Sequence, residues 1–332
     1  MKKPILFYYP SAGKNNKYDN PYSENLKESM SEYFRVMESN NPYVKNYRSI
    51  RLFLRAFQAD VFILSWIEQI WKFKWGTFFT KAAVKLMHLR RKKVIWIYHN
   101  LQPHAGENTK SLNLKQFFLA NSDFIITHSK EALAKIQPTT TVPVKYLPHP
   151  IKTIVTQKWP GTPFPCDILI WGSILPYKGI LEFISLDAIQ NSDFKIRIIG
   201  KCKDEHLLNQ IQSKCNKNII LENRYADFDE LATYIQKAKW TLFPYIGDSI
   251  SSSGALIDTI AMGGRPIGPD RGAFHDLAEE GVCAVYQNHA ELIKLLNSTY
   301  TITTSHRNYF IKQYSWKNFS HEIWNIINIT AK

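Results

Sequence analysis

Cysteine is scarce in this chain, with four residues among 332, all of them after residue 165. None of the four has Cys-x-x-Cys spacing, and we expect structural thiols in a reducing cytoplasm. No run of about 18 apolar residues occurs, so no membrane-spanning helix is expected. The apolar start ILFYY is shorter than the roughly 7 to 15 apolar residues of a signal-peptide core, and it predicts a buried first strand instead.

Two common nucleotide-binding motifs are also missing. No Gly-x-Gly-x-x-Gly follows the first predicted strand and no Walker lysine pattern occurs, which disfavours dinucleotide oxidoreductases and P-loop enzymes. No cluster of His, Cys or Asp has metal-ligand spacing, and no Asp-x-Asp lies in a loop after a strand. The sequence therefore predicts a reaction with no metal and no other cofactor.

Acidic residues are scarce in the first half only. Residues 1–150 hold 23 Lys and Arg against 10 Asp and Glu, a balance of +13, while the whole chain has 42 against 28. The remainder, with 19 against 18, is nearly neutral. Such asymmetry indicates that one half faces an anionic partner while the other half has a separate role.

Short apolar strands alternate with helical segments along the chain, and a proline-rich linker interrupts them at 157–166. In the first half, for example, a helix from Pro21 to about Val36 precedes a buried strand at 60–66. The alternation predicts an α/β protein with two Rossmann-like domains, whose parallel sheets face across a cleft. The predicted parts are a basic domain over 1–155, a second domain over 165–310, and a helix over 311–332 able to cross back to the first domain.

Several motifs resemble one family when they are taken in order. WGSILPYKG (171–179) and SSSGALIDTIAMGGRPIGP (251–269) are similar to the donor-site elements of GT-B glycosyltransferases, and NPYSENL, IWIYHNLQPH, DFIITHS and YLPHP are similar to segments of their acceptor halves. The chain thus resembles bacterial polysaccharide- and glycolipid-assembly transferases of the family 4-like type. The resemblance implies a UDP- or GDP-sugar donor bound by the second domain and a lipid-linked or saccharide acceptor bound by the first.

The second domain supplies the candidate donor-binding residues. Small residues at a helix start let free N–H groups approach phosphate oxygens, although a serine there also fits an ordinary helix cap. A lysine in the loop after the first strand of this domain would reach the same diphosphate, unless it is only a solvated surface residue. The candidates are Gly172, Ser173, Lys178, Arg224, Tyr225, Tyr245, Ser252, Ser253, Gly254 and Asp258.

Two positions depart from the family pattern. In retaining members two glutamates lie eight residues apart across this helix, whereas Asp258 and Ile250 occupy those positions here. Family members usually have an arginine after the glycine of the first element, whereas this chain has Ser173 there. The stereochemical outcome of the reaction therefore stays open.

The first domain supplies the candidate catalytic residues. His99 ends a predicted strand, and in the resembling families a histidine there contacts the donor sugar. A histidine at the end of a strand is also often only structural. Asp19 and Glu24 are candidates for a general base if the anomeric centre is inverted, although carboxylates in loops are usually solvated or capping.

A basic and aromatic segment over 66–93 is the second feature of the first domain. Its members are Trp66, Trp71, Trp75, Phe78, Phe79, Lys72, Lys74, Lys81, Lys85, Arg90, Arg91, Lys92 and Lys93. This composition suits an anionic membrane interface, single-stranded nucleic acid, or a core helix with a solvated face. Together with the resemblance it predicts a cytoplasmic enzyme, peripheral at the inner face of the membrane, that builds surface polysaccharide.

Two rival functions follow from the same observations. A nucleic-acid-binding protein would use the basic half, and its binding would fall steeply with salt. Another GT-B-like nucleotide-sugar enzyme, such as an epimerase, would share the donor-site elements. The glycosyltransferase hypothesis predicts no nucleic-acid partner.

Overall fold

The computed structural model describes residues 2–9, 21–37, 48–67, 70, 75–99, 109–154, 159, 161, 166–247, 252–299 and 301–329. The chain divides into two compact units. Unit 1 comprises Met1–Pro150 with Ser315–Lys332, and unit 2 comprises Ile151–Tyr314. The predicted α/β architecture with two parallel sheets is confirmed.

Unit 1 is built on a six-stranded sheet of order β2-β1-β3-β4-β5-β6, in which every pair is parallel. The strands are β1 (Ile5–Tyr9), β2 (Arg35–Val36), β3 (Val61–Ser65), β4 (Lys93–Tyr98), β5 (Phe124–Thr127) and β6 (Val144–Tyr146). The helices are α1 (Pro21–Met30), α2 (Arg48–Arg55), α3 (Gly76–Leu89), α4 (Thr109–Asn121), α5 (Lys130–Ile136) and α14 (Trp316–Ile329), with a short 3₁₀ turn η3 (Gln137–Thr139).

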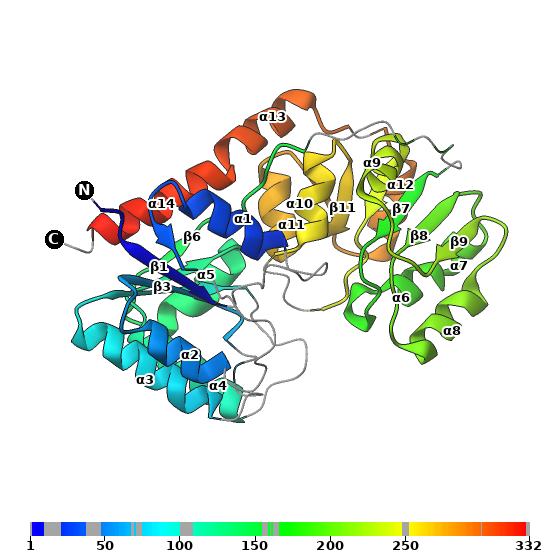
Figure 1. Ribbon diagram of the computed structural model, residues 1–332. Helices are drawn as coiled ribbons and strands as arrows, with labels where there is room; N and C mark the ends of the chain where they lie inside the picture. The colour runs from blue at the N-terminus through cyan, green and yellow to red at the C-terminus, as the bar shows by residue number, and fades with distance from the viewer. Residues whose placement is uncertain are drawn as a thin grey trace. The chain divides into compact units, whose positions relative to one another are not determined.

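Both faces of the sheet in unit 1 are covered because its strands are apolar on both sides. Helices α2 to α5 pack over one face, and α1 with α14 packs over the other (Figure 1). Buried Trp96 belongs to the first core and buried Ile323 of α14 to the second. The last helix of the chain is therefore part of the core that contains the first strand.

Unit 2 has a second parallel sheet, of order β12-β11-β10-β7-β8-β9. Its strands are β7 (Ile168–Trp171), β8 (Ile196–Ile199), β9 (Ile219–Glu222), β10 (Trp240–Leu242), β11 (Pro266–Pro269) and β12 (Ala284–Tyr286). Its helices are α6 (Ile180–Ile184), α7 (Asp187–Gln190), α8 (Glu205–Lys214), α9 (Phe228–Lys237), α10 (Gly254–Ala261), α11 (Gly272–Glu279), α12 (His289–Asn297) and α13 (Thr304–Gln313), with a 3₁₀ turn η4 (Pro176–Lys178).

The strand order places a topological switch point in each sheet. In unit 2 the first strand, β7, lies between β8 and β10, so the chain leaves β7 and β10 toward opposite sides of the sheet. In unit 1 the corresponding neighbours are β1 and β3. Loops diverge at such a point and leave a crevice beyond the carboxyl ends of the strands, where ligands of open α/β sheets bind.

Two elements differ from the sequence-based expectation. The first helix ends at Met30 instead of continuing to about Val36, because Arg35 and Val36 pair with Ile5 and Leu6 as the edge strand β2. Helix α2 was not predicted; its buried residue Leu52 packs into the same core as α3. No helix in the described ranges is long and apolar enough to cross a membrane.

Candidate active site

In unit 2, the loops after β7 and β10 meet at the switch point. Gly179 has a positive φ of 63°, and a Cβ there would lie 2.0 Å from the carbonyl oxygen of Pro244. Only glycine lets the two loops approach this closely. The N–H of Ile246 donates to the carbonyl of Tyr177 at 3.0 Å and joins the loops directly.

This junction buries the Lys178 ammonium. The Lys178 side chain is 9% exposed, and its Nζ lies 5.2 Å from the centroid of the Tyr245 ring. Burial alone would lower the pKa of Lys178, but Tyr245 and Tyr177 more than offset that effect, and the pKa is raised from its usual value. No carboxylate pairs with this lysine in the described part of the chain, so a fixed positive charge stands at the switch point.

The start of α10 lies beside the same lysine. Ser253 caps the helix by accepting a hydrogen bond from the N–H of Leu256 at 3.4 Å, and its Oγ is 3.2 Å from the hydroxyl of Tyr245. A Cβ on Gly172 would lie 3.5 Å from the Nζ of Lys178 and 3.8 Å from the Cβ of Ala255. Gly172, Lys178, Tyr245 and Ser253 are thus brought together.

The first turn of α10 offers backbone donors to this space. The N–H groups of Gly254 and Ala255 have no acceptor among the described residues, as is usual for the first turn of a helix. A Cβ on Gly254 would meet nothing within 4 Å, so the approach to these donors is open. Amides and helix dipole together with a buried lysine form a suitable binding site for phosphate oxygens.

Asp258 lies one turn further along α10. Burial raises the pKa of its carboxyl to about 6, although Lys152 lowers it again in part. A carboxyl with this pKa changes its charge near neutral pH. Ser252 precedes the Ser253 cap and is half-buried. Ser173, which follows Gly172, is exposed.

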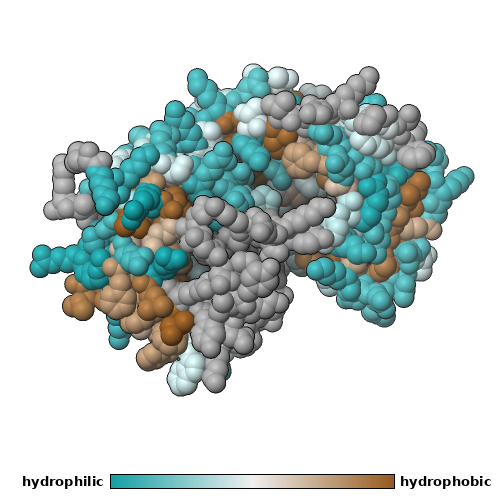
Figure 2. All heavy atoms as spheres, in the orientation of Figure 1, coloured by the Kyte–Doolittle hydropathy of each residue, from teal (hydrophilic) through white to brown (hydrophobic). Residues whose placement is uncertain are grey.

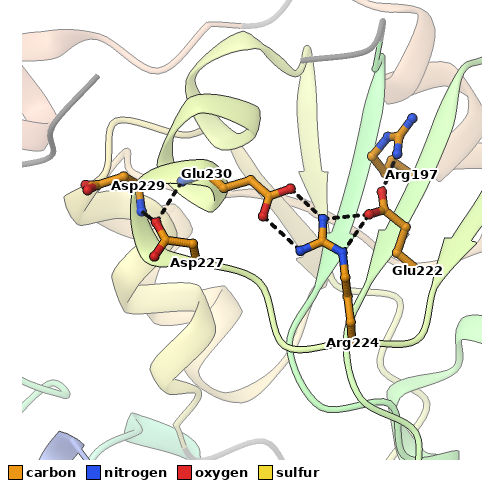
Figure 3. A network of polar contacts seen from close by, with 6 residues as sticks. All are labelled: Arg197, Glu222, Arg224, Asp227, Asp229 and Glu230. Atoms are coloured by element: carbon orange, nitrogen blue, oxygen red, sulfur yellow. Dashed lines mark hydrogen bonds and ion pairs between the residues drawn. The ribbon is translucent and has the colours of Figure 1, made fainter. Parts of the chain in front are cut away.

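Arg224 is held by carboxylates of its own unit (Figure 3). Its guanidinium donates to Glu222 Oε2 at 2.6 and 2.8 Å and to Glu230 at 2.5 and 2.8 Å, and Glu222 also pairs with buried Arg197. The hydrogen bonds that Arg224 donates raise its pKa above the usual value, and those to Glu230 have a larger effect than those to Glu222. Tyr225 next to it is 60% exposed. Arg224 therefore fixes the loop after β9, and the ring of Tyr225 in this loop is exposed to solvent.

A pocket of about 450 Å³ adjoins Tyr245 beyond the ends of β10, β11 and β12. Arg271 lines it and donates from Nη2 to the carbonyl of Tyr245 at 2.9 Å, while its buried Nε has no partner among the described residues. The sequence analysis did not single out Arg271. Its position directly after a strand, at Pro269-Asp270-Arg271, was the available signal.

In unit 1, His99 lies at the carboxyl end of β4 and is buried. Its ring stacks on Trp66 with centroids 4.0 Å apart and an interplanar angle of 7°, and Tyr22 packs edge-on against it at 4.7 Å. The Nε2 atom of His99 has no hydrogen-bond partner in the described residues. Trp66 itself has a positive φ of 47°, so the chain accepts backbone strain where this ring is presented.

Two further histidines complete a cluster that the sequence analysis did not assign. We call Tyr22, Trp66, His99, His128, His149 and Trp316 the histidine–aromatic cluster. His128 Nδ1 donates to the carbonyl of Leu147 at 2.8 Å, so its Nε2 accepts from the Tyr22 hydroxyl at 2.9 Å. His128 and His149 each follow a strand end, and only the fold brings them to His99.

The histidines of this cluster are neutral. Burial, with smaller effects of the other two histidines, holds the pKa of His99 well below its usual range. Burial likewise lowers the pKa of His128 to about 3 and that of His149 to about 4. Within the described residues, no three His, Cys, Asp or Glu side chains are placed to hold a metal ion.

The remaining predicted positions lie elsewhere. Glu24 is on the exposed side of α1 and pairs with Lys27 at 3.2 Å, away from the ring of Tyr22. Asp19 and Ile250 lie outside the described residues.

The basic and aromatic segment is divided between core and surface. Trp66 is partly buried and packs in the histidine–aromatic cluster, so it is not part of an exposed surface. Trp75 and Phe78 are each 62% exposed, and Trp71, Lys72 and Lys74 lie outside the described residues. Arg90 donates to backbone carbonyls of Ala56 and Ala59.

No protein-family model and no curated protein sequence matches this chain. Solved structures are similar over its whole length. Anabaena HepE in complex with UDP has 12% identity over 99% of this chain and 100% of its own, with a TM-score of 0.67. An Escherichia coli structure described as trehalose-6-phosphate bound with UDP-2-fluoro glucose has 8% identity over 97% and 99%, with a TM-score of 0.66. A glycosyltransferase of avilamycin A biosynthesis has 11% identity over 98% and 97%, with a TM-score of 0.63. These neighbours are GT-B glycosyltransferases, and the chain has the GT-B fold.

Proposed function

We propose that the protein is a glycosyltransferase that takes a sugar from a nucleotide diphosphate donor. The observation that carries this proposal is the buried cation of Lys178, which pairs with no carboxylate of the described residues and lies beside the open first turn of α10. Binding of UDP or of a UDP-sugar analogue by two similar structures supports a donor of the same class. UDP-sugars are therefore the first donors to test, and GDP-sugars the second.

Unit 2 would stabilise the leaving nucleotide diphosphate. As the glycosidic bond to the donor breaks, negative charge develops on the leaving phosphate oxygen, and fixed positive groups lower the energy of that state. Lys178 supplies a full charge, and the amides of Gly254 and Ala255 supply oriented dipoles. These groups can take the charge without a metal or another cofactor. Asp258 would accept hydrogen bonds from donor hydroxyls.

Unit 1 would hold the acceptor and contact the transferred sugar. His99 is neutral, and its unpartnered Nε2 can exchange a hydrogen bond with a hydroxyl group. Aromatic rings around it give the apolar surface on which sugar faces pack. Asp19 and Glu24 stay the candidates for a general base in an inverting reaction.

The exposed apolar surface of unit 1 supports a lipid-linked acceptor. Hydrophobic side chains gather over α2 and α3 in Figure 2, at the lower left. We call the residues that form this surface the apolar patch; they are Leu54, Phe57, Trp75, Phe78 and Leu89, each more than half exposed. Exposed Lys85 lies among them on α3. Apolar anchors with basic neighbours fit the headgroup region of an anionic bilayer. We infer a peripheral enzyme at the inner face of the membrane that builds surface glycans.

Thermal denaturation with a panel of nucleotide sugars tests the donor. At least one UDP- or GDP-sugar should raise the melting temperature of the wild type, and Lys178→Ala should abolish that shift. Lys214→Ala, at the end of α8, removes an exposed lysine of the same unit and should keep it. If no nucleotide sugar binds, or if the two variants behave alike, the proposed function is wrong.

Vesicle sedimentation tests the acceptor side. The wild type should bind vesicles that contain phosphatidylglycerol, and Phe78→Ser with Trp75→Ser should reduce the bound fraction several-fold. Binding to a single-stranded oligonucleotide in place of vesicles would instead favour the nucleic-acid function.

A further inference from the structure

A second cavity of unit 1 lies at the amino ends of its strands. Its volume is about 710 Å³, and Ile5, Val61 and Lys93, which start β1, β3 and β4, stand side by side along it. The residues lining it are Lys2, Lys3, Pro4, Ile5, Asp60, Val61, Arg91, Lys92, Lys93, Trp324, Ile327 and Asn328. His99 is at the opposite end of β4, about 20 Å away at about 3.3 Å per residue. This basic cavity is therefore separate from the histidine–aromatic cluster.

The charges of the basic cavity are unbalanced. Among the described residues, five cations line it, and Asp60 is the one carboxylate. Asp60 is already engaged, because Oδ1 accepts from Lys92 at 2.6 Å and Oδ2 accepts from the N–H of Ile5 at 2.8 Å. Burial would raise the pKa of Asp60, but these hydrogen bonds and the nearby cations lower it overall. The carboxylate thus stays ionised and bound in the wall.

Three of the cations are not paired with a carboxylate in the described part of the chain. Lys93 lies 3.5 Å from Asp123, whereas Lys3 donates only to the backbone carbonyl of Ser31, at 2.8 Å. Among the described residues, Lys2 and Arg91 have neither kind of partner. Their charges face a concave surface with one wall formed by α14, and like charges held together in this way attract a multivalent anion.

Arg91 occupies a position that favours glycine. Helix α3 ends in a Schellman motif, in which the N–H of Arg91 donates to the carbonyl of His88 and the N–H of Lys92 to that of Met87. The residue between the last turn and Lys92 must be left-handed, and Arg91 has φ 55°. A residue with a Cβ is disfavoured in this conformation, so Arg91 adopts a backbone geometry that costs more than it would for glycine.

We propose that the basic cavity binds a phosphate-bearing anion, separately from the donor site. Arg91 would grip phosphate oxygens through its planar guanidinium, and Lys2 and Lys3 would add charge. A phosphate group carries more charge than a carboxylate and matches five cations better. The same chemistry is offered by a soluble polyphosphate and by a lipid phosphomonoester headgroup, and two titrations separate these sources.

The first titration measures inorganic tripolyphosphate by calorimetry. All proteins carry Lys178→Ala, which removes the phosphate site proposed for unit 2, so the result does not depend on the proposed transferase function. Arg91→Gly should weaken binding at least about 10-fold. Because glycine fits the left-handed turn, the same variant should not lower the melting temperature. Lys214→Ala removes one exposed charge at the end of α8, outside both the cavity and the apolar patch, and should change affinity less than about 2-fold.

The second titration uses phosphatidylcholine vesicles with and without phosphatidic acid. Vesicle binding that needs phosphatidic acid and is lost in Arg91→Gly but kept in Lys214→Ala identifies a lipid headgroup as the source. Tripolyphosphate binding with the same pattern and no such vesicle effect identifies a soluble anion. The proposal is overturned if neither probe distinguishes Arg91→Gly from Lys214→Ala, because the cavity would then act only as part of a general basic surface.

Discussion

The two units have similar sheet topology but different side chains at the carboxyl ends of their strands. Each has a parallel sheet with a switch point, and each collects unusual side chains at the carboxyl ends of its strands. In unit 2 these are a buried cation, Lys178, and the open amides of α10. In unit 1 they are three neutral histidines among aromatic rings. One edge is arranged for an anion and the other for uncharged hydroxyl groups.

This difference shows that the net charge of a unit does not predict the charge at the carboxyl edge of its sheet. Unit 1 contains most of the excess positive charge of the chain, yet the six side chains of its histidine–aromatic cluster are uncharged. Its described cations lie instead around the basic cavity and on the outer helices. Unit 2 is nearly neutral overall but buries Lys178 at its switch point, with no carboxylate of the described residues paired to it. The position of a single desolvated charge is more informative than the balance of a whole domain.

Acidification should separate the two units most strongly. The unfolded chain protonates its histidines near pH 6.5, whereas His99, His128 and His149 resist protonation in the fold. The stability they contribute is complete above about pH 6.5 and is lost as the pH falls toward about 3 to 4. At pH 5.5 each histidine costs unit 1 ~1 kcal/mol relative to pH 7.5. Asp258 has the opposite sign, since its raised pKa of about 6 stabilises unit 2 by ~1 kcal/mol over the same interval.

Hydrogen exchange read by mass spectrometry reports each unit separately in the full chain. After correction for the intrinsic pH dependence of exchange, core amides of β4 should lose protection between pH 7.5 and 5.5, while those of β7 should not. His149→Gln should reduce the loss in unit 1. A parallel loss in both units would contradict the neutral cluster.

Lys178→Ala should have the largest effect on activity. It removes the desolvated charge proposed to face the leaving diphosphate, and kcat/KM should fall at least about 100-fold, or ~3 kcal/mol. Steady-state kinetics with the donor found in the thermal panel measures it, and Lys214→Ala is the matched control. Equal losses in both variants would mean that Lys178 acts only through general electrostatics.

Much of the fold could be predicted from the sequence, because its strands are continuous apolar runs. The segments that start at Ile5, Val61 and Lys93 all form central parallel strands. Helix α2 could not be found in this way, since Arg48 and Arg51 interrupt its apolar pattern and its contact with α3 depends on tertiary packing. The early end of α1 has the same kind of cause, because strand pairing at Arg35 outweighs a helical periodicity.

Short local motifs were enough to propose some candidate site residues. Lys178 and Ser253 lie in two such motifs, and the fold brings both beside Tyr245, while their roles stay predictions. The sequence could not reveal contacts between residues that are distant along the chain, or ion pairs that engage a candidate residue within its own unit. His128 and His149 join His99 only through the sheet, and Arg224 is bound by Glu222 and Glu230, which no motif foretells.

His99→Ala should lower turnover more than nucleotide binding. If the ring contacts the transferred sugar, kcat should fall about 10- to 100-fold, while the Kd of UDP, bound by unit 2, stays within about 2-fold of the wild type. His99→Gln keeps a hydrogen-bonding group and should recover part of the activity. Kinetics and UDP calorimetry on the same preparations distinguish this outcome from a purely structural role, in which melting temperature and both constants change together.

Gly254→Ala should have the smallest effect and the most specific one. A Cβ at this position meets nothing within 4 Å, so the fold has room for it, and alanine in a helix is favoured over glycine. The melting temperature should therefore stay the same or rise. If phosphate oxygens approach the first amides of α10, the added methyl group stands in their path, and the Kd of UDP should increase about 3- to 10-fold.

Gly247→Ala provides the control, because a Cβ there also meets nothing within 4 Å in the loop before α10. A Kd that is unchanged by Gly254→Ala, or raised equally by Gly247→Ala, would move the phosphate site away from this helix. Lys178 would then be the described feature that makes the edge of unit 2 cationic and distinguishes it from the neutral edge of unit 1.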